Sequence, residues 1–216
     1  MVDHDSRAVR HIHDELHSHL PSEPALRVKA LESLLIEKGL VDPRTVDAWV
    51  EGYSEEIGPK RGARMVARAW VDPAFRELLL SDAAEAAAQF GFDGTGISHL
   101  TAHENTDDVH HLVVCTLCSC YPQGVLGIPP TWYKMAAYRA RAVREPRGVL
   151  EEFGVRLSDE VEVQVWDSTA ELRHMVVPQR PADTEGWSEE RLAKLVTRNS
   201  MIGTDRDLSR MVKEAT

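Results

Sequence analysis

Cysteine is nearly absent from this sequence, since its 216 residues include 3 cysteines. An odd number of thiols leaves one unpaired, and a disulfide between Cys118 and Cys120 would be strained. Long apolar runs are also missing, because no uninterrupted stretch approaches the roughly 18 residues of a membrane helix. The N-terminus lacks the basic-then-apolar pattern of a signal peptide. We therefore expect a soluble cytoplasmic protein without a membrane partner.

Positive charge is scarce as well. Lysine and arginine number 25 against 35 aspartates and glutamates, which gives a net charge of -10. No basic stripe with interleaved aromatic residues occurs, so nucleic acid is not an expected partner. The length allows one substantial core with an extension.

The three cysteines stand together at positions 115, 118 and 120. The two-residue separation between Cys115 and Cys118 lets two sulfurs converge on one ion, and Cys120 adds a third sulfur beyond Ser119. We call residues 115–120 the claw. A structural zinc site would need a second Cys-x-x-Cys, and a thioredoxin-like redox pair would leave Cys120 without a role. Both remain minor alternatives.

A metal held by three thiolates on one face has further positions to fill. The nearest remaining donors are the backbone nitrogens of Ser119 and Cys120, which bind only after losing their protons. Such binding demands a strongly polarising ion such as Co(III) or Fe(III), and thiolates around that ion are open to oxidation to sulfenic and sulfinic acids. Water or substrate would take the last position, where the ion acts as a Lewis acid.

The claw and its surroundings closely resemble the α subunit of nitrile hydratase, from about Arg27 to Gly203. The matching runs are Val114-Cys115-Thr116-Leu117-Cys118-Ser119-Cys120-Tyr121-Pro122, Val125-Leu126-Gly127-Ile128-Pro129-Pro130-Thr131-Trp132-Tyr133-Lys134, Arg144-Glu145-Pro146-Arg147, Trp166-Asp167-Ser168-Thr169-Ala170-Glu171, Pro178-Gln179-Arg180-Pro181, Gly186-Trp187-Ser188 and Glu104-Asn105-Thr106. The resemblance implies an α+β fold. A helical N-terminal arm would precede a globular domain of mixed, largely antiparallel β-sheets flanked by helices in α-β-β-α layers.

The resemblance also implies a metal and its ligands. In that family threonine after the first cysteine sorts with cobalt and serine with iron, so Thr116 implies one non-corrin Co(III) ion per α subunit. The implied ligands are the sulfurs of Cys115, Cys118 and Cys120 and the amide nitrogens of Ser119 and Cys120. Cys118 is expected to become a sulfinate and Cys120 a sulfenate, whereas Cys115 stays a thiolate.

The implied reaction is hydration of a nitrile to the amide, with Cys118, Ser119 and Cys120 as catalytic residues. The sequence leaves open whether a hydroxide held by the metal or the sulfenate oxygen of Cys120 is the nucleophile. In the family, arginines of the β subunit stabilise the oxidised sulfurs. We therefore expect a heterodimer or heterotetramer with a β subunit, and a cobalt-loading activator is a further candidate partner.

Three arginines of this chain are local candidates for supporting the claw: Arg144, Arg147 and Arg173. A role in structural or interface ion pairs explains each of them better.

Two positions depart from the family pattern. Cobalt members generally read Tyr-Pro-Trp-Pro after the claw, whereas this chain reads Tyr121-Pro122-Gln123-Gly124. The loss of an indole and a proline favours a bulky or polar nitrile, such as a heteroaromatic or nucleoside nitrile of the toyocamycin type. Upstream, Gly96 stands where the family commonly has a glutamine that orients water. The expected substrate pocket consists of Thr116, Tyr121, Gln123 and Gly124.

Two alternative functions stay open. The metal-bearing subunit of thiocyanate hydrolase resembles nitrile hydratase and uses the same claw on cobalt, although the neutral Gln123 argues mildly against an anionic substrate. A non-catalytic cobalt-carrying subunit would bind the metal without turning over nitriles.

Hydrophobic periodicity divides the chain into a polar, disordered tail over residues 1–23, a helical arm over 24–91 and a metal-binding α+β domain over 92–216. In the tail, His13 and His17 are spaced to share an ion on a helix, but a solvated tail explains them better. The predicted helices of the arm cover 24–38, 43–57, 59–70 and 73–80, followed by an alanine-rich helix that Ser81 caps and Gly91 ends. We expect this arm to lie over a partner subunit.

Beyond residue 92, alternation of apolar residues predicts strands. Leu100 and Ala102 indicate one strand, and residues 112–114 form a second that delivers Cys115 to its turn. Residues 161–165 form a third, with residues 175–177 as its antiparallel mate across the loop 168–172. Helices are predicted over 131–143 and, as the last element, over 189–197.

Overall fold

The computed structural model describes residues 23–46, 58–92, 97 and 99–214 and divides into two compact units, Met1–Val50 and Glu51–Thr216. In the first unit, α2 (Glu23–Glu37) is followed by Gly39 at a positive φ of 67°. This confirms the first predicted helix and its stop. No residue of α2 is buried, and its leucines are exposed. The second predicted helix is present over residues 43–46, and the rest of it lies outside the described residues, as do His13, His17 and Gly96.

The second unit begins with three helices, α4 (Gly58–Val71), α5 (Pro73–Ser81) and α6 (Ala83–Ala88). The predicted start of α5 at residue 73 is confirmed, because Pro73 stands in its first turn and the Asp72 carboxylate caps the helix by accepting the backbone N–H groups of residues 74 and 75. The predicted cap of α6 is wrong. Ser81 is still in the last turn of α5, where its hydroxyl donates to the carbonyl of Glu77, and Asp82 caps α6 instead.

Seven further helices are described after the claw: α7 (Gln123–Leu126), α8 (Thr131–Lys134), α9 (Ala136–Arg144), α10 (Pro146–Glu152), α11 (Glu189–Ala193), α12 (Arg198–Ile202) and α13 (Ser209–Glu214). The single helix predicted over 131–143 is two, because Met135 has an extended backbone with ψ of 135° and separates α8 from α9. The helix predicted as the last one is α11, yet α12 and α13 follow it.

The described part of the chain contains four strands: β1 (Leu100–Glu104), β2 (Val109–Val114), β3 (Glu162–Asp167) and β4 (Arg173–Val177). β1 pairs with β4 and β2 pairs with β3, and both pairs are parallel. The prediction of largely antiparallel sheets is therefore wrong for the described pairs, as is the antiparallel pairing of β3 with β4. The loop 168–172 connects the two sheets, since Ser168 N–H donates to Val114 at one end and Arg173 N–H donates to His99 at the other.

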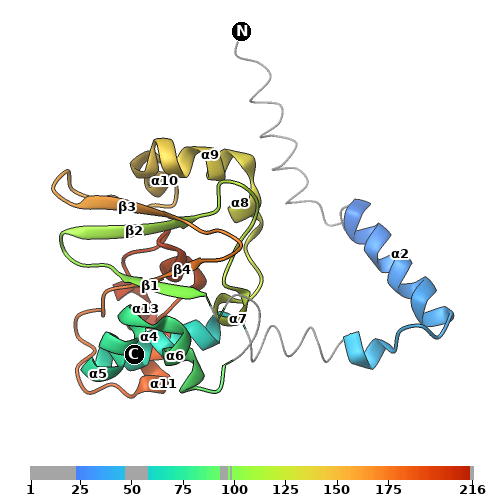
Figure 1. The fold of residues 1–216 in the computed structure, drawn as a ribbon, viewed down its shortest axis with the longest axis horizontal. Coiled ribbons are helices and arrows are strands. Elements are labelled where there is room, and N and C mark those ends of the chain that lie inside the picture. Colours follow the sequence, from blue (N-terminus) through green and yellow to red (C-terminus); the bar gives the residue numbers. More distant parts are fainter. Residues whose placement is uncertain (1–22, 47–57, 93–96, 98, 215–216) are drawn as a thin grey trace, which may run out of the picture. The chain divides into compact units, whose positions relative to one another are not determined.

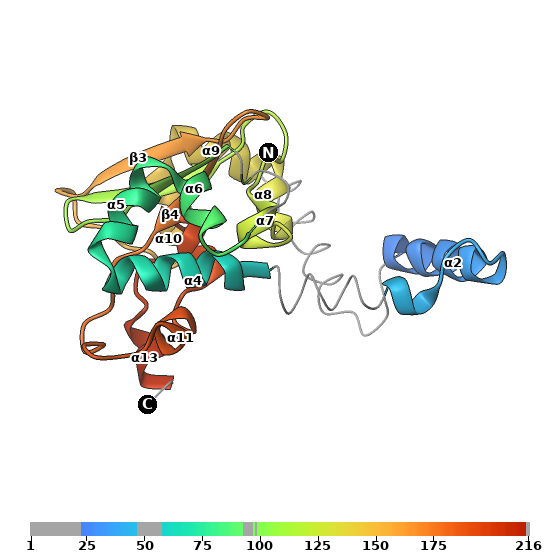
Figure 2. The same ribbon diagram turned by 60° about the horizontal axis from the view of Figure 1, so that its bottom comes forward.

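The two sheets and their helices form the predicted α-β-β-α layers (Figure 1). Helices α9 and α10 contact β2 and β3, whereas α5 and α6 contact β1 on the other side. Figure 2, turned by 60°, shows α4, α5 and α6 on that same side of the strands. The α+β fold class is thus confirmed. Because α4, α5 and α6 belong to the same compact unit as the strands, they pack within it, and the boundary predicted at residues 91 and 92 stays a prediction.

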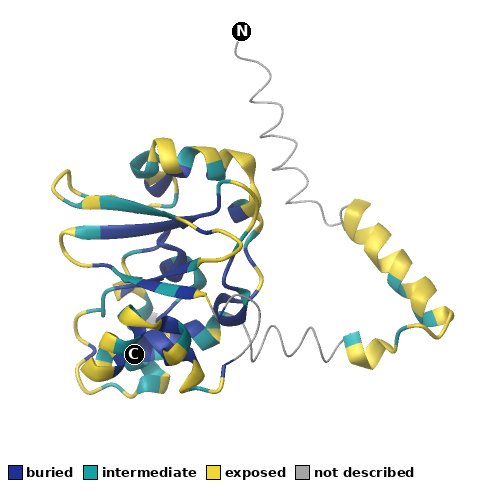
Figure 3. Ribbon diagram, viewed as in Figure 1, coloured by how far each residue is buried: buried dark blue, intermediate teal, exposed yellow. Residues whose placement is uncertain are grey.

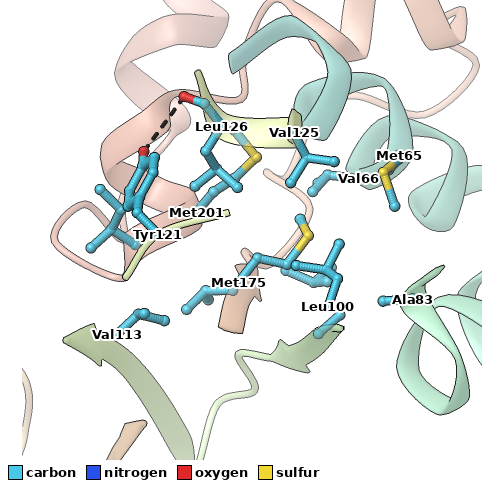
Figure 4. Close-up of a cluster of buried hydrophobic side chains, with 14 of the residues drawn as sticks. Met65, Val66, Ala83, Leu100, Val113, Tyr121, Val125, Leu126, Met175 and Met201 are labelled. Atoms are coloured by element: carbon cyan, nitrogen blue, oxygen red, sulfur yellow. Dashed lines mark hydrogen bonds between the residues drawn. The ribbon is translucent and has the colours of Figure 1, made fainter. Parts of the chain in front are cut away.

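The buried residues of this unit concentrate on the strands and on the inward faces of the helices (Figure 3). Met65, Leu112, Met175 and Met201 are completely buried, and Figure 4 shows Met65 and Met201 among the side chains that meet near α4 and α7. Gly62 lets the side chain of Met201 pack closely against α4, because a Cβ at position 62 would lie 2.7 Å from the sulfur of Met201. Among the described residues, no helix has both the length and the apolar character that a membrane crossing requires.

Candidate metal centre

The claw starts where β2 ends. Cys115 directly follows Val114 and is 1% exposed, and β3 runs parallel beside it so that Val114 lies opposite Asp167. The Asp167 carboxylate accepts two hydrogen bonds from Thr116, one from its backbone N–H at 2.9 Å and one from its hydroxyl at 2.5 Å. The first turn of the claw is therefore fixed by β2, which precedes it, and by β3, which binds it through Asp167.

The three sulfurs converge as the spacing predicts. The Sγ of Cys118 lies 3.5 Å from that of Cys115 and 3.1 Å from that of Cys120, and all three sulfurs lie within 4.8 Å of one another. The backbone amides of Ser119 and Cys120 help to lower the pKa of Cys118, and the backbone N–H of Cys118 donates to the sulfur of Cys115 at 3.3 Å. The structure thus brings together the three sulfurs named from the sequence, and binding of a metal by the two amide nitrogens stays a prediction.

The protonation of the thiols reflects their crowding. Hydrogen bonds from Cys120 and Cys115 lower the pKa of Cys118 to about 7. Burial and the hydrogen bond with Cys118 raise the pKa of Cys120 to about 12, against an opposing influence from the Arg173 guanidinium. The exposed Cys118 is therefore the first of these two thiols to become a thiolate.

Two side chains from outside the claw bind its carbonyl groups. Arg139, on α9, donates from Nη1 to the carbonyl oxygens of Cys118 at 3.1 Å and Thr116 at 3.5 Å. Tyr133, on α8, donates its hydroxyl to the carbonyl of Cys120 at 3.0 Å. The claw is consequently held by side chains from β3, α8 and α9, although its outer residues are exposed.

The donor set fits a single metal ion. A thiolate sulfur binds a transition-metal ion at about 2.3 Å. Two sulfurs bound at right angles to one such ion are therefore about 3.3 Å apart. The observed separations of 3.1 and 3.5 Å bracket that value, and the sulfurs of Cys115 and Cys120 lie within 4.8 Å of each other. In addition, Nε and Nη1 of Arg173 are buried without a hydrogen-bond partner, and this guanidinium acts on Cys120. Such a cation suits a centre that gains negative charge.

The other arginines named from the sequence lie elsewhere. Arg147 donates to the carbonyl oxygens of Ser158 and Val161, where it fixes the loop before β3. Arg144 is an exposed residue at the end of α9. Of the three, Arg173 alone interacts with a claw cysteine among the described contacts.

The four residues expected in the substrate pocket differ in exposure. Thr116 and Gln123 are partly exposed, whereas Gly124 is buried. Tyr121 is 3% exposed, and its hydroxyl approaches the carbonyl of Leu126 (Figure 4). The substrate pocket expected from these four residues stays a prediction.

Three residues that bind the claw were not identified as site residues from the sequence: Tyr133, Arg139 and Asp167. The one usable signal was the position of Asp167 at the end of a predicted strand, because parallel strands bring their carboxyl ends together. That signal depended on pairing β3 with β2. Arg139 and Tyr133 lie on helices whose sequence pattern reveals nothing of what they face.

A second group of polar side chains lies on the strands, and we call it the strand histidines: His103, His110, His111 and His174. His103 Nε2 and His174 Nδ1 are 2.9 Å apart, and His103 stacks on Trp166 with ring centroids 3.7 Å apart. Trp166 donates to His111 Nδ1 at 3.0 Å, and His110 Nε2 lies 2.7 Å from the carbonyl oxygen of Gly203. Burial lowers the pKa of His103 to about 3 and that of His110 to about 4.

These histidines do not form a metal site. Within the part of the chain that the structure describes, the claw is the one group of three or more cysteine, histidine or acidic side chains whose ligand atoms meet closely enough to hold an ion. A chain with this layered fold and a three-thiol claw at a strand end is of the class that can hold a metal ion on cysteine sulfurs.

Comparison with known proteins identifies the family within that class. The model of the family "nitrile hydratase, alpha chain" matches residues 22–205, so this chain belongs to the nitrile hydratase alpha family. It is 58% identical over 182 residues to a nitrile hydratase subunit alpha of a Rhodococcus species, covering 84% of this chain and 92% of the relative. It is 54% identical to the low-molecular weight cobalt-containing nitrile hydratase subunit alpha of Rhodococcus rhodochrous, covering 88% and 94%.

Relatives with other names are also similar. Thiocyanate hydrolase subunit gamma of Thiobacillus thioparus is 42% identical, over 81% of this chain and 76% of the relative. Among solved structures, a double mutant of the Fe-type nitrile hydratase from Comamonas testosteroni Ni1 matches with a TM-score of 0.74 at 42% identity, covering 84% of this chain and 88% of that one. The fold therefore accommodates relatives that are named for different metals and substrates.

Proposed function

We propose that this chain is the α subunit of a cobalt nitrile hydratase, which hydrates nitriles to amides together with a β subunit. The observation that carries the proposal is the convergence of three cysteine sulfurs directly after the end of β2. The membership in the nitrile hydratase alpha family and the cobalt named for a relative at 54% identity support it. Thr116, with the family's sorting of threonine to cobalt, favours the same metal.

Each claw residue has a proposed role. Cys115, Cys118 and Cys120 supply thiolate sulfur, and Ser119 and Cys120 supply amide nitrogen. When bound, trivalent cobalt would act as a Lewis acid toward the nitrile. Cys118 is proposed to carry the sulfinate and Cys120 the sulfenate, because the partnerless guanidinium nitrogens of Arg173 offer hydrogen bonds to new oxygen atoms near Cys120.

The proposed substrate is a bulky or polar nitrile. Gln123 begins α7 beside the claw and is partly exposed, so its amide can hydrogen-bond to a substrate where an indole would only exclude it. The expected measurement is a higher kcat/KM for heteroaromatic or nucleoside nitriles than for acrylonitrile, with Gln123→Trp reversing the order by about tenfold. Equal values for both substrate classes in the wild type would contradict this part.

The proposed partner is a β subunit. The apolar side chains of α2, including Leu26, Leu31 and Leu34, are 50–61% exposed, which suits a helix that another subunit covers. A cobalt-loading activator is a further proposed partner, since the claw has to receive its metal before the subunits cover it.

The test is co-expression of the full chain with a nitrile hydratase β subunit in cobalt medium. We expect about one cobalt per α chain, a mass gain of two oxygens on Cys118 and one on Cys120, and turnover of nitriles to amides. Parallel assays with thiocyanate distinguish the second candidate, which the likeness to thiocyanate hydrolase subunit gamma favours. Zinc bound to unmodified thiols would refute both.

A further inference from the structure

We propose that Arg139 is a positioning residue of the claw that stabilises the anionic peptide between Cys118 and Ser119. The inference rests on the proposed function, because it concerns how this chain's own residues prepare the claw for cobalt. It begins with the guanidinium of Arg139, which donates to Cys118 O at 3.1 Å and to Thr116 O at 3.5 Å. One planar cation therefore binds two carbonyl groups of the same turn.

The carbonyl of Cys118 and the nitrogen of Ser119 belong to one peptide group. When Ser119 nitrogen binds a metal, its proton goes to solvent and the electron pair of the broken N–H bond forms the bond to the ion. Because the peptide bond is conjugated, the negative charge left behind is shared with the carbonyl oxygen of the same peptide. Arg139 therefore donates to the atom where this charge arrives, and a charge-assisted hydrogen bond strengthens as that charge develops.

The charges of the centre make such a cation useful. Three thiolates and two deprotonated amides carry an excess of about two negative charges over a trivalent ion. Arg139 has no ion-pair partner among the described contacts, and its Nε is buried without a hydrogen bond. Its charge is thus not neutralised by a carboxylate and remains available to the claw.

Tyr133 provides a comparison within the same turn. Its hydroxyl donates to the carbonyl of Cys120 at 3.0 Å, but the nitrogen of that peptide belongs to Tyr121 and is not a proposed ligand. Tyr133 therefore holds the claw in position without touching a peptide that becomes charged. Arg141, two residues beyond Arg139 on α9, pairs with Glu145 and Glu152 and makes no described contact with the claw.

The experiment compares four variants of the full chain, Arg139→Gln, Arg139→Lys, Tyr133→Phe and Arg141→Gln, each co-expressed with the β subunit at limiting cobalt. Three quantities are measured: cobalt per chain, the visible sulfur-to-metal absorption, and the melting temperature of the metal-free chain. We expect Arg139→Gln to hold about tenfold less cobalt than the wild type and to shift the absorption of what is bound. Arg139→Lys should recover part of the cobalt, because it keeps the charge but lacks the planar fork.

Tyr133→Phe should lose less than about threefold in cobalt without an absorption shift, and Arg141→Gln should match the wild type. Wild-type cobalt and absorption in Arg139→Gln would overturn the inference, as would an equal loss in Tyr133→Phe, since that shows a merely structural role. If the metal-free Arg139→Gln chain shows no melting transition, it is unfolded, and the Arg139→Lys variant becomes the test. An absorption of Arg139→Lys equal to that of the wild type then overturns the inference. A wild-type chain without cobalt would instead refute the proposed function and this inference with it.

Discussion

The claw, which follows β2, and the strand histidines, which lie on β1, β2 and β4, are both clusters of ionisable groups, but their hydrogen bonds are completed in different ways. Trp166 is only a donor, so His111 Nδ1 accepts from it as a neutral ring, and His103 and His174 share one proton between two nitrogens. None of the buried polar side-chain atoms that lack a partner in the described part of the chain is a histidine nitrogen. The strand histidines therefore find hydrogen-bond partners within the chain, without a ligand.

The claw is different because its surroundings are incomplete. Three thiols lie within 4.8 Å of one another, and buried nitrogens of Arg139 and Arg173 close to them lack partners. A folded chain tolerates such groups when a ligand or a modification completes them. The difference teaches that a cluster of ionisable residues indicates function when its partners are missing, and indicates structure when they are present.

The largest expected effect separates the two clusters directly. Cys118→Ser should reduce bound cobalt and nitrile hydration by at least about 100-fold, because it removes the sulfur that contacts both other thiols. His103→Phe should keep cobalt within about twofold of the wild type, since His103 contacts only the other strand residues. Metal analysis and turnover of the co-expressed complexes check this. Equal losses in both variants would show that the two clusters act as one site.

The next effect concerns the support of the strand histidines. Gly203 has a φ of 95°, and a Cβ there would collide with the backbone carbonyl of His111. Gly203→Ala should therefore lower the free energy of unfolding by about 4 kcal/mol, from backbone strain and overpacking together. Gly154→Ala, at φ of 83° with nothing within 4 Å, carries the strain alone and should cost about 1 kcal/mol. Urea denaturation of the metal-free chains measures both, and equal costs would contradict the predicted collision.

The sequence predicted the claw better than its surroundings, for a physical reason. Three thiols at positions 115, 118 and 120 are local in sequence, so their convergence follows from spacing alone. Asp167, Arg139 and Tyr133 reach the claw through strand pairing and helix packing, which alternation and helical periodicity do not determine.

The strands themselves show the same limit. Alternation located β1 and β3, whereas continuous apolar runs located β2 and β4, which are buried on both faces. Neither pattern reports the partner of a strand, and the short loop 168–172 suggested a hairpin where the chain changes from one sheet to the other. The helix starts gave a mixed result, since Pro73 begins α5 as predicted but Asp82 caps α6 in place of Ser81.

A pH dependence distinguishes the strand histidines from the claw without any metal. His110 has a pKa of about 4 in the folded state because it is buried, and its two nitrogens are engaged by Gly203 and Arg206. The unfolded chain takes up this proton first as the pH falls, so the stabilisation is complete above about pH 6.5 and is lost toward pH 4. The loss should reach about 3 kcal/mol.

Unfolding of the metal-free chain between pH 7 and 4 measures this loss, and His110→Gln serves as the control. The variant should be less stable at pH 7 and should have a flatter dependence on pH. The same slope in the variant and the wild type would assign the acid sensitivity to other groups.

The smallest expected effect tests how the claw is attached to β3. Thr116 binds Asp167 through its N–H and its hydroxyl, at 2.9 and 2.5 Å. Thr116→Val keeps the first hydrogen bond and leaves one carboxylate oxygen without its partner, which should cost about 1 to 2 kcal/mol of stability. Thr116→Ser keeps both hydrogen bonds and should stay within about 0.5 kcal/mol of the wild type.

If Thr116→Ser nevertheless changes which metal is loaded from a mixed cobalt and iron medium, the γ-methyl group and not the hydrogen bond distinguishes the metals. An unchanged metal content would place that choice outside residue 116, in the supply of the ion or in the partner subunit.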